Sequence, residues 1–192
     1  AALGTQHFAN LGTQQVTGFT TDQLAAIESS DLAALGTRGM RALGTDQIAA
    51  LTSDGIIALT TAQAGSLTSA QVAGLTSDQI AAMATDDLRA VGTALSTDQL
   101  AALTSDQLPQ LTTLQVASLT TAQVASLTTD DLTALSTQQF AGMATTQLRA
   151  LTSDQLGAMA SDDLAALGTR GIRALDSAQL GALSTDGIQA LS

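Results

Sequence analysis

The chain is built almost entirely from one eight-residue unit with the consensus Leu-Thr-[Ser/Thr]-Asp-Gln-Leu-Ala-Ala. Eleven complete units, which we call octads, run from Leu3 to Ala90, and twelve more run from Leu95 to Ala190. A half unit, residues 91–94, lies between them. Positions 1 and 6 of the octad are apolar, position 3 is Ser or Thr in every octad, and position 5 is Gln in fourteen octads. Because one octad is too short to enclose a core, each unit must bury its apolar side chains against its neighbours.

Each octad is predicted to form one short α-helix, so that the fold is an all-α solenoid. Eight is not a multiple of 3.6, and one continuous helix would therefore rotate its apolar stripe around its axis. Position 3 is predicted to be the N-cap, with Asp at position 4 or 5 in the first turn, where the helix dipole favours an anion. The helix is then expected to end at position 2 of the next octad. Glycine at position 2 is expected to be a left-handed C′ residue, at Gly4, Gly12, Gly36, Gly44, Gly92 and Gly168.

A β-solenoid is the alternative fold for a short threonine-rich repeat. A strand through positions 5 to 9 would place positions 6 and 8 on one face and the recurring leucine on the other. Gln, Ala and Asp are poor strand formers. The helical interpretation is therefore favoured.

The repeats are expected to form a single continuous array over residues 1–192, because no linker or composition shift separates them. Both termini lie inside a repeat, and we expect the chain to be an excerpt of a longer repetitive protein. Similar residues recur sixteen apart, as at Gly39 and Gly55, which favours two octads per coil. The half-repeat insertion at 91–94 is expected to shift the register or kink the array. Pro109, at position 7 of its octad, is expected to distort that helix.

Composition excludes several classes of function. The net charge is −11, with six arginines against seventeen acids, and no lysine or cysteine is present. Nucleic-acid binding needs a cationic face, so no nucleic-acid partner is expected. Polar residues interrupt every apolar stretch well before about 20 residues, so membrane insertion is not expected either.

Few side chains could support chemistry, and we expect no catalysis, no cofactor and no metal site. His7 is the single histidine, so no second imidazole can join it as a metal ligand. Three acidic pairs occur in the sequence, and we expect them to stabilise helix starts, with weak divalent-cation binding as the alternative: Asp86-Asp87, Asp130-Asp131 and Asp162-Asp163. The arginines are expected to bridge to aspartates on the next coil, with a ligand-binding basic pair as the alternative: Arg38, Arg41, Arg89, Arg149, Arg170 and Arg173.

Two stretches, residues 55–77 and 107–129, carry no charge at all. Drift between Asp, Ala and Gln at exposed positions explains this in one interpretation. In the other, the array self-associates through these two faces, because side chains without charge repulsion can pack against another chain. The charge elsewhere would keep the array in solution.

The octads resemble the Leu-Thr-Thr-x-Gln tandem repeats of long bacterial secreted and surface proteins, as in Leu119-Thr-Thr-Ala-Gln123 and Leu103-Thr-Ser-Asp-Gln107. The resemblance covers the whole chain and implies an extracellular or cell-surface location and a non-catalytic role. The pattern is also similar to the short-helix superhelices of the mesothelin and stereocilin group. We therefore expect a stalk, spacer or fibre segment. The alternative is an adhesin-like module that binds a protein or a glycan.

Overall fold

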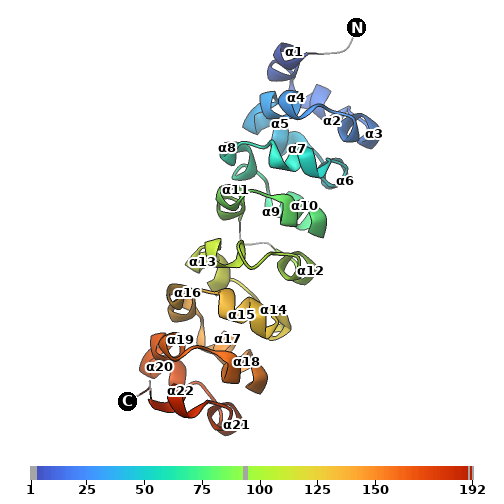
Figure 1. Cartoon of the computed structure of the whole chain (residues 1–192). Coiled ribbons are helices and arrows are strands. Elements are labelled where there is room, and N and C mark those ends of the chain that lie inside the picture. The colour runs from blue at the N-terminus through green and yellow to red at the C-terminus, as the bar shows by residue number, and fades with distance from the viewer. Residues whose placement is uncertain (1–3, 93–94, 190, 192) are drawn as a thin grey trace. The chain divides into compact units, whose positions relative to one another are not determined.

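The computed structural model describes residues 4–92, 95–189 and 191, and these residues form 22 short α-helices, one 3₁₀ helix and no strand (Figure 1). The predicted all-α solenoid of one short helix per octad is thereby confirmed. The chain divides into two compact units, Ala1–Leu103 and Thr104–Ser192. The expectation of one continuous array stays a prediction.

The first unit contains twelve helices in its described residues: α1 (Thr5–Ala9), α2 (Thr13–Thr17), α3 (Thr21–Ala25), α4 (Ser29–Ala34), α5 (Gly36–Ala42), α6 (Thr45–Ala49), α7 (Ser53–Ile57), α8 (Thr61–Ala64), α9 (Ser69–Gly74), α10 (Ser77–Ala82), α11 (Thr85–Ala90) and α12 (Thr97–Ala101). The second unit contains η1 (Leu108–Gln110), α13 (Thr113–Ala117), α14 (Thr121–Ser126), α15 (Thr129–Ala134), α16 (Thr137–Gly142), α17 (Thr145–Ala150), α18 (Ser153–Ala158), α19 (Ser161–Ala166), α20 (Gly168–Ile172), α21 (Ser177–Gly181) and α22 (Thr185–Gln189).

In most of these helices the N-cap is position 2 of the octad, not position 3 as predicted; α5 and α20 are capped at position 1, by Leu35 and Leu167. In α9 the cap is Thr68, whose hydroxyl accepts the N–H of Gln71, while the Gln71 side chain accepts the N–H of Thr68. This reciprocal pair is a capping box, which satisfies two otherwise unpaired helix donors. Where position 2 is the cap, position 3 is the first helical residue, as Ser69 is in α9.

Most helices end before the large apolar residue of the next octad. Leu75, which follows α9, is already extended, with φ −64° and ψ 141°. The predicted left-handed glycine is present only at Gly36 and Gly168, with φ of 72° and 61°. The prediction is wrong for Gly4, Gly12 and Gly44, which are extended N-caps, and for Gly92, whose φ is not positive.

Three octads make one coil, so the prediction of two is wrong. Helix α6 begins at Thr45 and contacts α9, which begins at Ser69, three octads later along the chain. The same step of three helices recurs within each unit, for example between α5 and α8 and between α16 and α19. In Figure 1, α8 and α11 lie one above the other on the same side of the first unit. Similar residues that recur sixteen positions apart in the sequence therefore do not indicate the number of octads per coil.

The core is a column of position-6 and position-1 side chains. Inside the array position 6 is fully buried, as at Ile48 and Leu132, and position 1 nearly so, as at Leu43. The small residue at position 8 allows coils to approach closely: a Cβ added to Gly142 would lie 3.5 Å from the Cβ of Thr113, on the coil before.

Two local irregularities of the array follow from the sequence, one at Pro109 and one at the half unit. Pro109 lies in η1, where a 3₁₀ turn replaces the α-helix, as the missing N–H and the ring predict. The half unit shortens its coil, because α12 stacks on α10 and begins at Thr97, two and a half octads after Ser77. The predicted register shift is confirmed, while Thr93 and Ala94 themselves lie outside the described residues.

Candidate functional site

The glutamine at position 5 is the most specific polar group of the fold, and it joins successive coils. The Nε2 atom of Gln71 donates to the carbonyl oxygens of Met40 at 2.8 Å and Leu43 at 2.7 Å, 31 and 28 residues earlier. Its Oε1 atom accepts the N–H of Thr68 at 2.8 Å. One side chain thus hydrogen-bonds a backbone N–H at the start of its own helix and two backbone carbonyls at the end of a helix on the preceding coil.

We call a residue with both contacts a bridging glutamine, and the same geometry recurs along both units. Each bridging amide bonds the preceding coil, with donor–acceptor distances from 2.7 to 3.4 Å, at Gln47, Gln63, Gln71, Gln79, Gln99, Gln139, Gln147, Gln155 and Gln179. All of these side chains except that of Gln47 are buried. Among the described residues, no buried side-chain nitrogen or oxygen lacks a hydrogen-bond partner.

Gln99 shows how the bridge adapts to the half unit. It donates to the carbonyls of Val72 and Leu75, both at 2.7 Å, 27 and 24 residues earlier. Each separation is half an octad shorter than in a regular coil. The glutamine therefore still bonds the position-6 and position-1 carbonyls of the preceding coil, although one octad of the coil is reduced to half.

Aspartate at position 5 makes a different contact with the preceding coil. Asp31 accepts the hydroxyl of Thr5 at 2.9 Å, and Asp163 accepts the hydroxyl of Thr137 at 3.0 Å, in both cases 26 residues earlier. Asp131 instead accepts the N–H of its own N-cap, Thr128, at 3.0 Å. The three acidic pairs all lie in the first turn of a helix, as predicted.

His7 is exposed and caps its own helix, because its Nδ1 atom accepts the N–H of Gly4 at 3.1 Å. It therefore takes the place of a glutamine in the capping box. Within the described residues, no three His, Cys, Asp or Glu side chains gather closely enough to hold a metal ion.

Two arginines contact backbone carbonyls on neighbouring coils. Arg149 Nε donates to Ala174 at 3.1 Å, and an Nη of Arg170 donates to Met143 at 3.4 Å. In the described part of the chain these two arginines do not form the predicted bridges to aspartates. Arg38 is exposed and lines a shallow hollow with Asn10 and Gly36.

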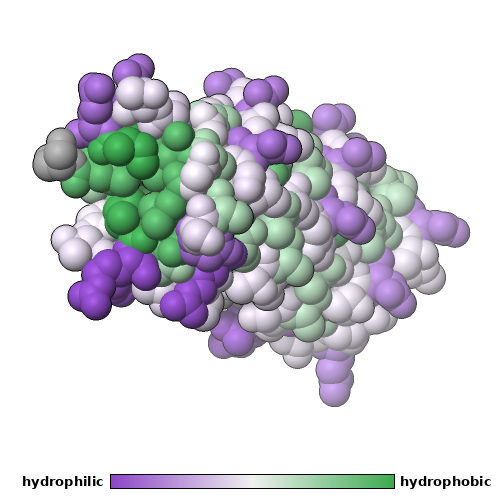
Figure 2. Space-filling view, turned by 90° about the horizontal axis from the view of Figure 1, so that it is seen from below, coloured by the Kyte–Doolittle hydropathy of each residue, from purple (hydrophilic) through white to green (hydrophobic). Residues whose placement is uncertain are grey.

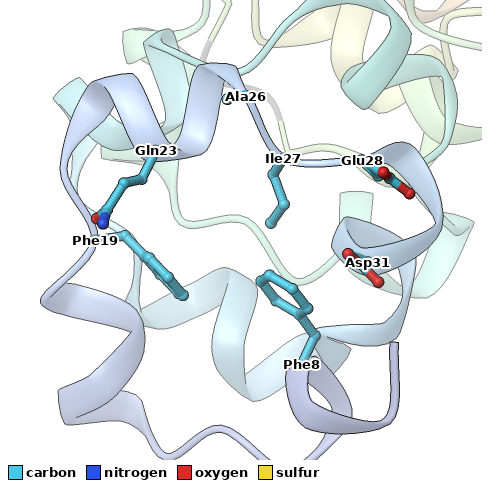
Figure 3. A pocket seen from close by; sticks show the side chains of 7 residues that line it. All are labelled: Phe8, Phe19, Gln23, Ala26, Ile27, Glu28 and Asp31. Atoms are coloured by element: carbon cyan, nitrogen blue, oxygen red, sulfur yellow. The ribbon is translucent and has the colours of Figure 1, made fainter. Parts of the chain in front are cut away.

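One small pocket lies in the first unit and combines aromatic and acidic side chains. The rings of Phe8 and Phe19 are stacked with their centroids 6.0 Å apart. In Figure 3 both rings and Ile27 point toward one another, with Glu28 and Asp31 on one side. The pocket has a volume of about 240 Å³, slightly below the roughly 300–1,000 Å³ of drug-sized ligand sites.

Each uncharged stretch carries one strongly exposed apolar side chain. Ile57 is 56% exposed and lies in residues 55–77, and Leu114 is 70% exposed and lies in residues 107–129. Self-association through these two faces stays a prediction. Exposed large apolar side chains are otherwise found at the C-terminal end, at Leu180 and Ile188. None of the described helices is both long and apolar enough to cross a membrane.

The bridging role of glutamine is absent from the sequence-based predictions, although its signal is present. Thr at position 2 and Gln at position 5 are three residues apart, as in Thr60 and Gln63, which is the spacing of a capping box. The prediction places the cap at position 3, and from there the glutamine has no capping partner. The contact with the preceding coil has no signature of its own in a chain whose octads are so alike.

Comparison with known proteins identifies the repeat. No curated protein matches the chain. The ALTTAQ repeat family matches five overlapping or neighbouring stretches, residues 24–61, 56–85, 80–113, 125–161 and 156–192. The letters of its name occur unchanged as Ala58-Leu-Thr-Thr-Ala-Gln63, where Thr60 is an N-cap and Gln63 a bridging glutamine. These matches cover most of the sequence, and the chain therefore belongs to the ALTTAQ repeat family.

Proposed function

We propose that this array is a structural element, a stalk, spacer or fibre segment of a bacterial protein that acts at the cell surface or outside the cell. The observation that carries the proposal is the bridging glutamine, as Gln71, Gln147 and Gln179 illustrate. The position-5 glutamine, the polar group that recurs most regularly, forms its hydrogen bonds inside the fold, between one coil and the next. An array built this way can change its length by whole coils without changing any contact type.

The surface chemistry fits the same role. The net charge of −11 comes from acids that mostly lie at exposed first-turn positions, such as Asp22, Asp46 and Asp154. Like charges on two arrays repel one another and keep the protein dispersed. The proposal gives the array no catalytic task.

Removal of one coil tests the proposal. Deletion of residues 43–66 takes three whole octads out of the first unit and joins Ala42 to Leu67. Gln71 then takes the place of Gln47, where its amide can bond the carbonyl of Phe19. The maximum dimension from small-angle X-ray scattering should fall by about 9 Å, one helix spacing, with unchanged helicity per residue.

A deletion of residues 43–63 is the matched control. It joins Ala42 to Ala64 and leaves only the end of an octad, residues 64–66. This remnant lacks a position-1 side chain, which the natural half unit retains in Val91. The control should therefore lose helicity and cooperative unfolding. If the in-phase deletion folds but leaves the maximum dimension unchanged, the array does not set reach and the spacer role is wrong.

A binding module is the second candidate, and the pocket between Phe8 and Phe19 is the observation that favours it. Two aromatic rings beside Glu28 and Asp31 offer an apolar face and carboxylate acceptors for sugar hydroxyls. Titration with hexoses and N-acetylhexosamines, followed by NMR, should shift the two phenylalanine rings in a saturable way. The Phe19→Ala variant should abolish that shift. Unchanged ring signals at all sugar concentrations would reject this candidate.

A further inference from the structure

We propose that the carboxylate of Asp87, the carbonyl oxygen of Leu59 and the hydroxyl of Thr61 form a calcium site between two coils of the first unit. The inference concerns ion binding and is independent of the structural role proposed above. It takes up the divalent-cation alternative for one acidic pair, Asp86-Asp87, and departs from the expectation of no metal site. A buried carboxylate without a hydrogen-bond donor, beside a carbonyl that also lacks one, carries the inference.

Asp87 lies in the first turn of α11 and is only 3% exposed. Neither of its carboxylate oxygens has a hydrogen-bond partner among the described residues, and α11 has no capping box. Arg89, on the same helix, is exposed and makes no ion pair with it in the described structure. A buried charge is costly unless it is paired or coordinates a cation. An unpaired buried group of this kind is a candidate site for an ion or a water molecule.

Other aspartates at position 5 of the octad have hydrogen-bond partners. Asp131 accepts the N–H of its own N-cap at 3.0 Å. Asp163 accepts the hydroxyl of Thr137, 26 residues earlier, at 3.0 Å. Thr61 lies at the same separation before Asp87, and α8 contacts α11, but no hydrogen bond joins the two side chains in the described structure. The hydroxyl and the carboxylate are therefore neighbours whose oxygens are both available to a cation.

The carbonyl of Leu59 occupies the place where a bridging glutamine would bond. Gln79 Nε2 donates to the carbonyl of Leu51, 28 residues earlier, at 2.7 Å. Leu59 lies 28 residues before Asp87 and is buried, and in the described part of the chain its carbonyl accepts no hydrogen bond. The aspartate side chain presents an acceptor in place of the amide donor and is one methylene shorter. Two acceptors then face a gap that a cation can fill.

Calcium is the ion that this set of oxygens fits. Ca²⁺ takes six to eight oxygen ligands at about 2.3–2.6 Å in flexible geometry, and carboxylates, backbone carbonyls and water all serve. Mg²⁺ demands a near-ideal octahedron and gives up its water reluctantly. Only one carboxylate takes part, in keeping with the absence of any cluster of three acidic side chains among the described residues. We therefore expect weak binding, with a Kd of about 0.1–1 mM, the range of extracellular calcium modules.

An ion from solution can reach this carboxylate. Among the described residues, every side-chain oxygen that is fully shielded from solvent has a hydrogen-bond partner. Asp87 has none, so its carboxylate retains a narrow contact with solvent. At other helix starts the acids are exposed and solvated, as at Asp154 and Asp186. Figure 2 shows hydrophilic residues projecting outward around the edge of the visible face. Those acids need no cation, whereas the buried carboxylate of Asp87 does.

The Asp87→Gln variant tests the site without disturbing the fold. It makes the octad 83–90 identical to the octad 143–150 except at position 4. In that second octad Gln147 accepts the N–H of Ala144 and donates to the carbonyl of Leu119, both at 2.8 Å. The variant should therefore replace the ion with an amide bridge. Asp131→Gln removes the same charge from the same octad position and is the matched control. Thr61→Ala removes only the hydroxyl ligand.

Titration with CaCl₂ at constant ionic strength, followed by NMR of the backbone amides, measures binding. The wild type should show saturable shifts at residues 59–61 and 86–88, with a midpoint of about 0.1–1 mM. Asp87→Gln should abolish these shifts, Thr61→Ala should raise the midpoint at least threefold, and Asp131→Gln should leave it unchanged. MgCl₂ should bind at least tenfold more weakly. Without calcium, Asp87→Gln should melt at a higher temperature than the wild type, and calcium should raise only the melting temperature of the wild type.

The proposal is overturned if no saturable shift appears at these residues up to about 10 mM CaCl₂, well above the weak end of calcium affinities. It is also overturned if Asp87→Gln keeps the saturable response or if Asp131→Gln loses it. Equal responses to MgCl₂ and CaCl₂ would show diffuse attraction to the acidic surface instead of a site. Because Thr61→Ala leaves the buried carboxylate in place, an unchanged midpoint in that variant would contradict the hydroxyl ligand even if Asp87→Gln failed to fold.

Discussion

The side-chain amide of Gln71 donates to the carbonyl oxygen of Leu43 at 2.7 Å across two successive coils. Inside a folded protein an unpaired polar group costs about 1–3 kcal/mol. The bridge therefore also removes the cost of an unpaired backbone carbonyl, which the buried Leu43 between two helices would otherwise carry.

Loss of the Nε2 donor should be costly in the interior and nearly neutral at the N-terminal end. Gln71→Glu preserves the oxygen that caps Thr68 but turns a carboxylate toward two carbonyls. We expect the free energy of unfolding in urea to fall by about 2–4 kcal/mol. The matched Gln23→Glu variant, whose side chain is exposed, should lose about 0.5 kcal/mol or less.

The pH dependence of the same Gln71→Glu variant provides a second check. Carbonyl oxygens facing the introduced carboxyl should raise its pKa above the value in the unfolded chain. The variant should then be most stable below the unfolded pKa and lose that stability as pH rises through the folded pKa. A stability difference from the wild type that is flat from pH 3 to 8 would contradict the bridge at this position.

The N-cap assignment can be tested by comparing adjacent threonines. Thr120 accepts the N–H of Gln123 at 3.2 Å, whereas Thr121 is the first helical residue of α14. Thr120→Ala should cost about 1 kcal/mol in urea unfolding, and Thr121→Ala should stay within about 0.5 kcal/mol of the wild type. The opposite order would restore position 3 as the cap.

The local fold could be predicted from the sequence, whereas the coil could not. The short helix per octad followed from apolar spacing and from the polar residues at the helix start, and the structure confirms it. The cap was misplaced by one residue because Ser or Thr occurs at position 3 in every octad, while position 2 also accepts glycine, as at Gly44. The number of octads per coil could not be predicted, because the octads are nearly identical and the sequence shows no period of three octads. That number depends on the turn between helices, which is set by extended residues such as Leu75 and Thr76.

Gly36 should resist substitution for a purely backbone reason. Its φ is 72°, and an added Cβ would meet nothing within 4 Å. Gly36→Ala should therefore cost about 1–2 kcal/mol from the left-handed conformation alone. Gly12→Ala lies at an extended N-cap with φ −76°, which Ala adopts without strain. Ala is a poorer N-cap than Gly, but it also lowers the entropy of the unfolded chain by about 0.4–1 kcal/mol, so this variant should lose about 0.5 kcal/mol or less. Equal losses in urea unfolding of the two variants would contradict this difference.

Replacement of Pro109 should stabilise the second unit. The proline lies where other octads have a helical residue, and only a 3₁₀ turn forms at Leu108–Gln110. A proline inside a helix costs about 3 kcal/mol, so Pro109→Ala should raise the thermal midpoint and the helical circular dichroism signal. A lower midpoint would show that the 3₁₀ turn is required by its neighbours.

The three-octad coil is tested most directly by disulfide formation, since the chain has no cysteine of its own. A Cβ added to Gly142 would lie 3.5 Å from that of Thr113, within the range of about 3.5–4.5 Å found in disulfides. The variant Thr113→Cys/Gly142→Cys should oxidise readily to an intramolecular disulfide, detected by peptide mapping and mass spectrometry. The control Thr121→Cys/Gly142→Cys, which a two-octad coil would bring together, should stay reduced. Cross-linking of the control pair with no disulfide in the first would contradict the coil described here.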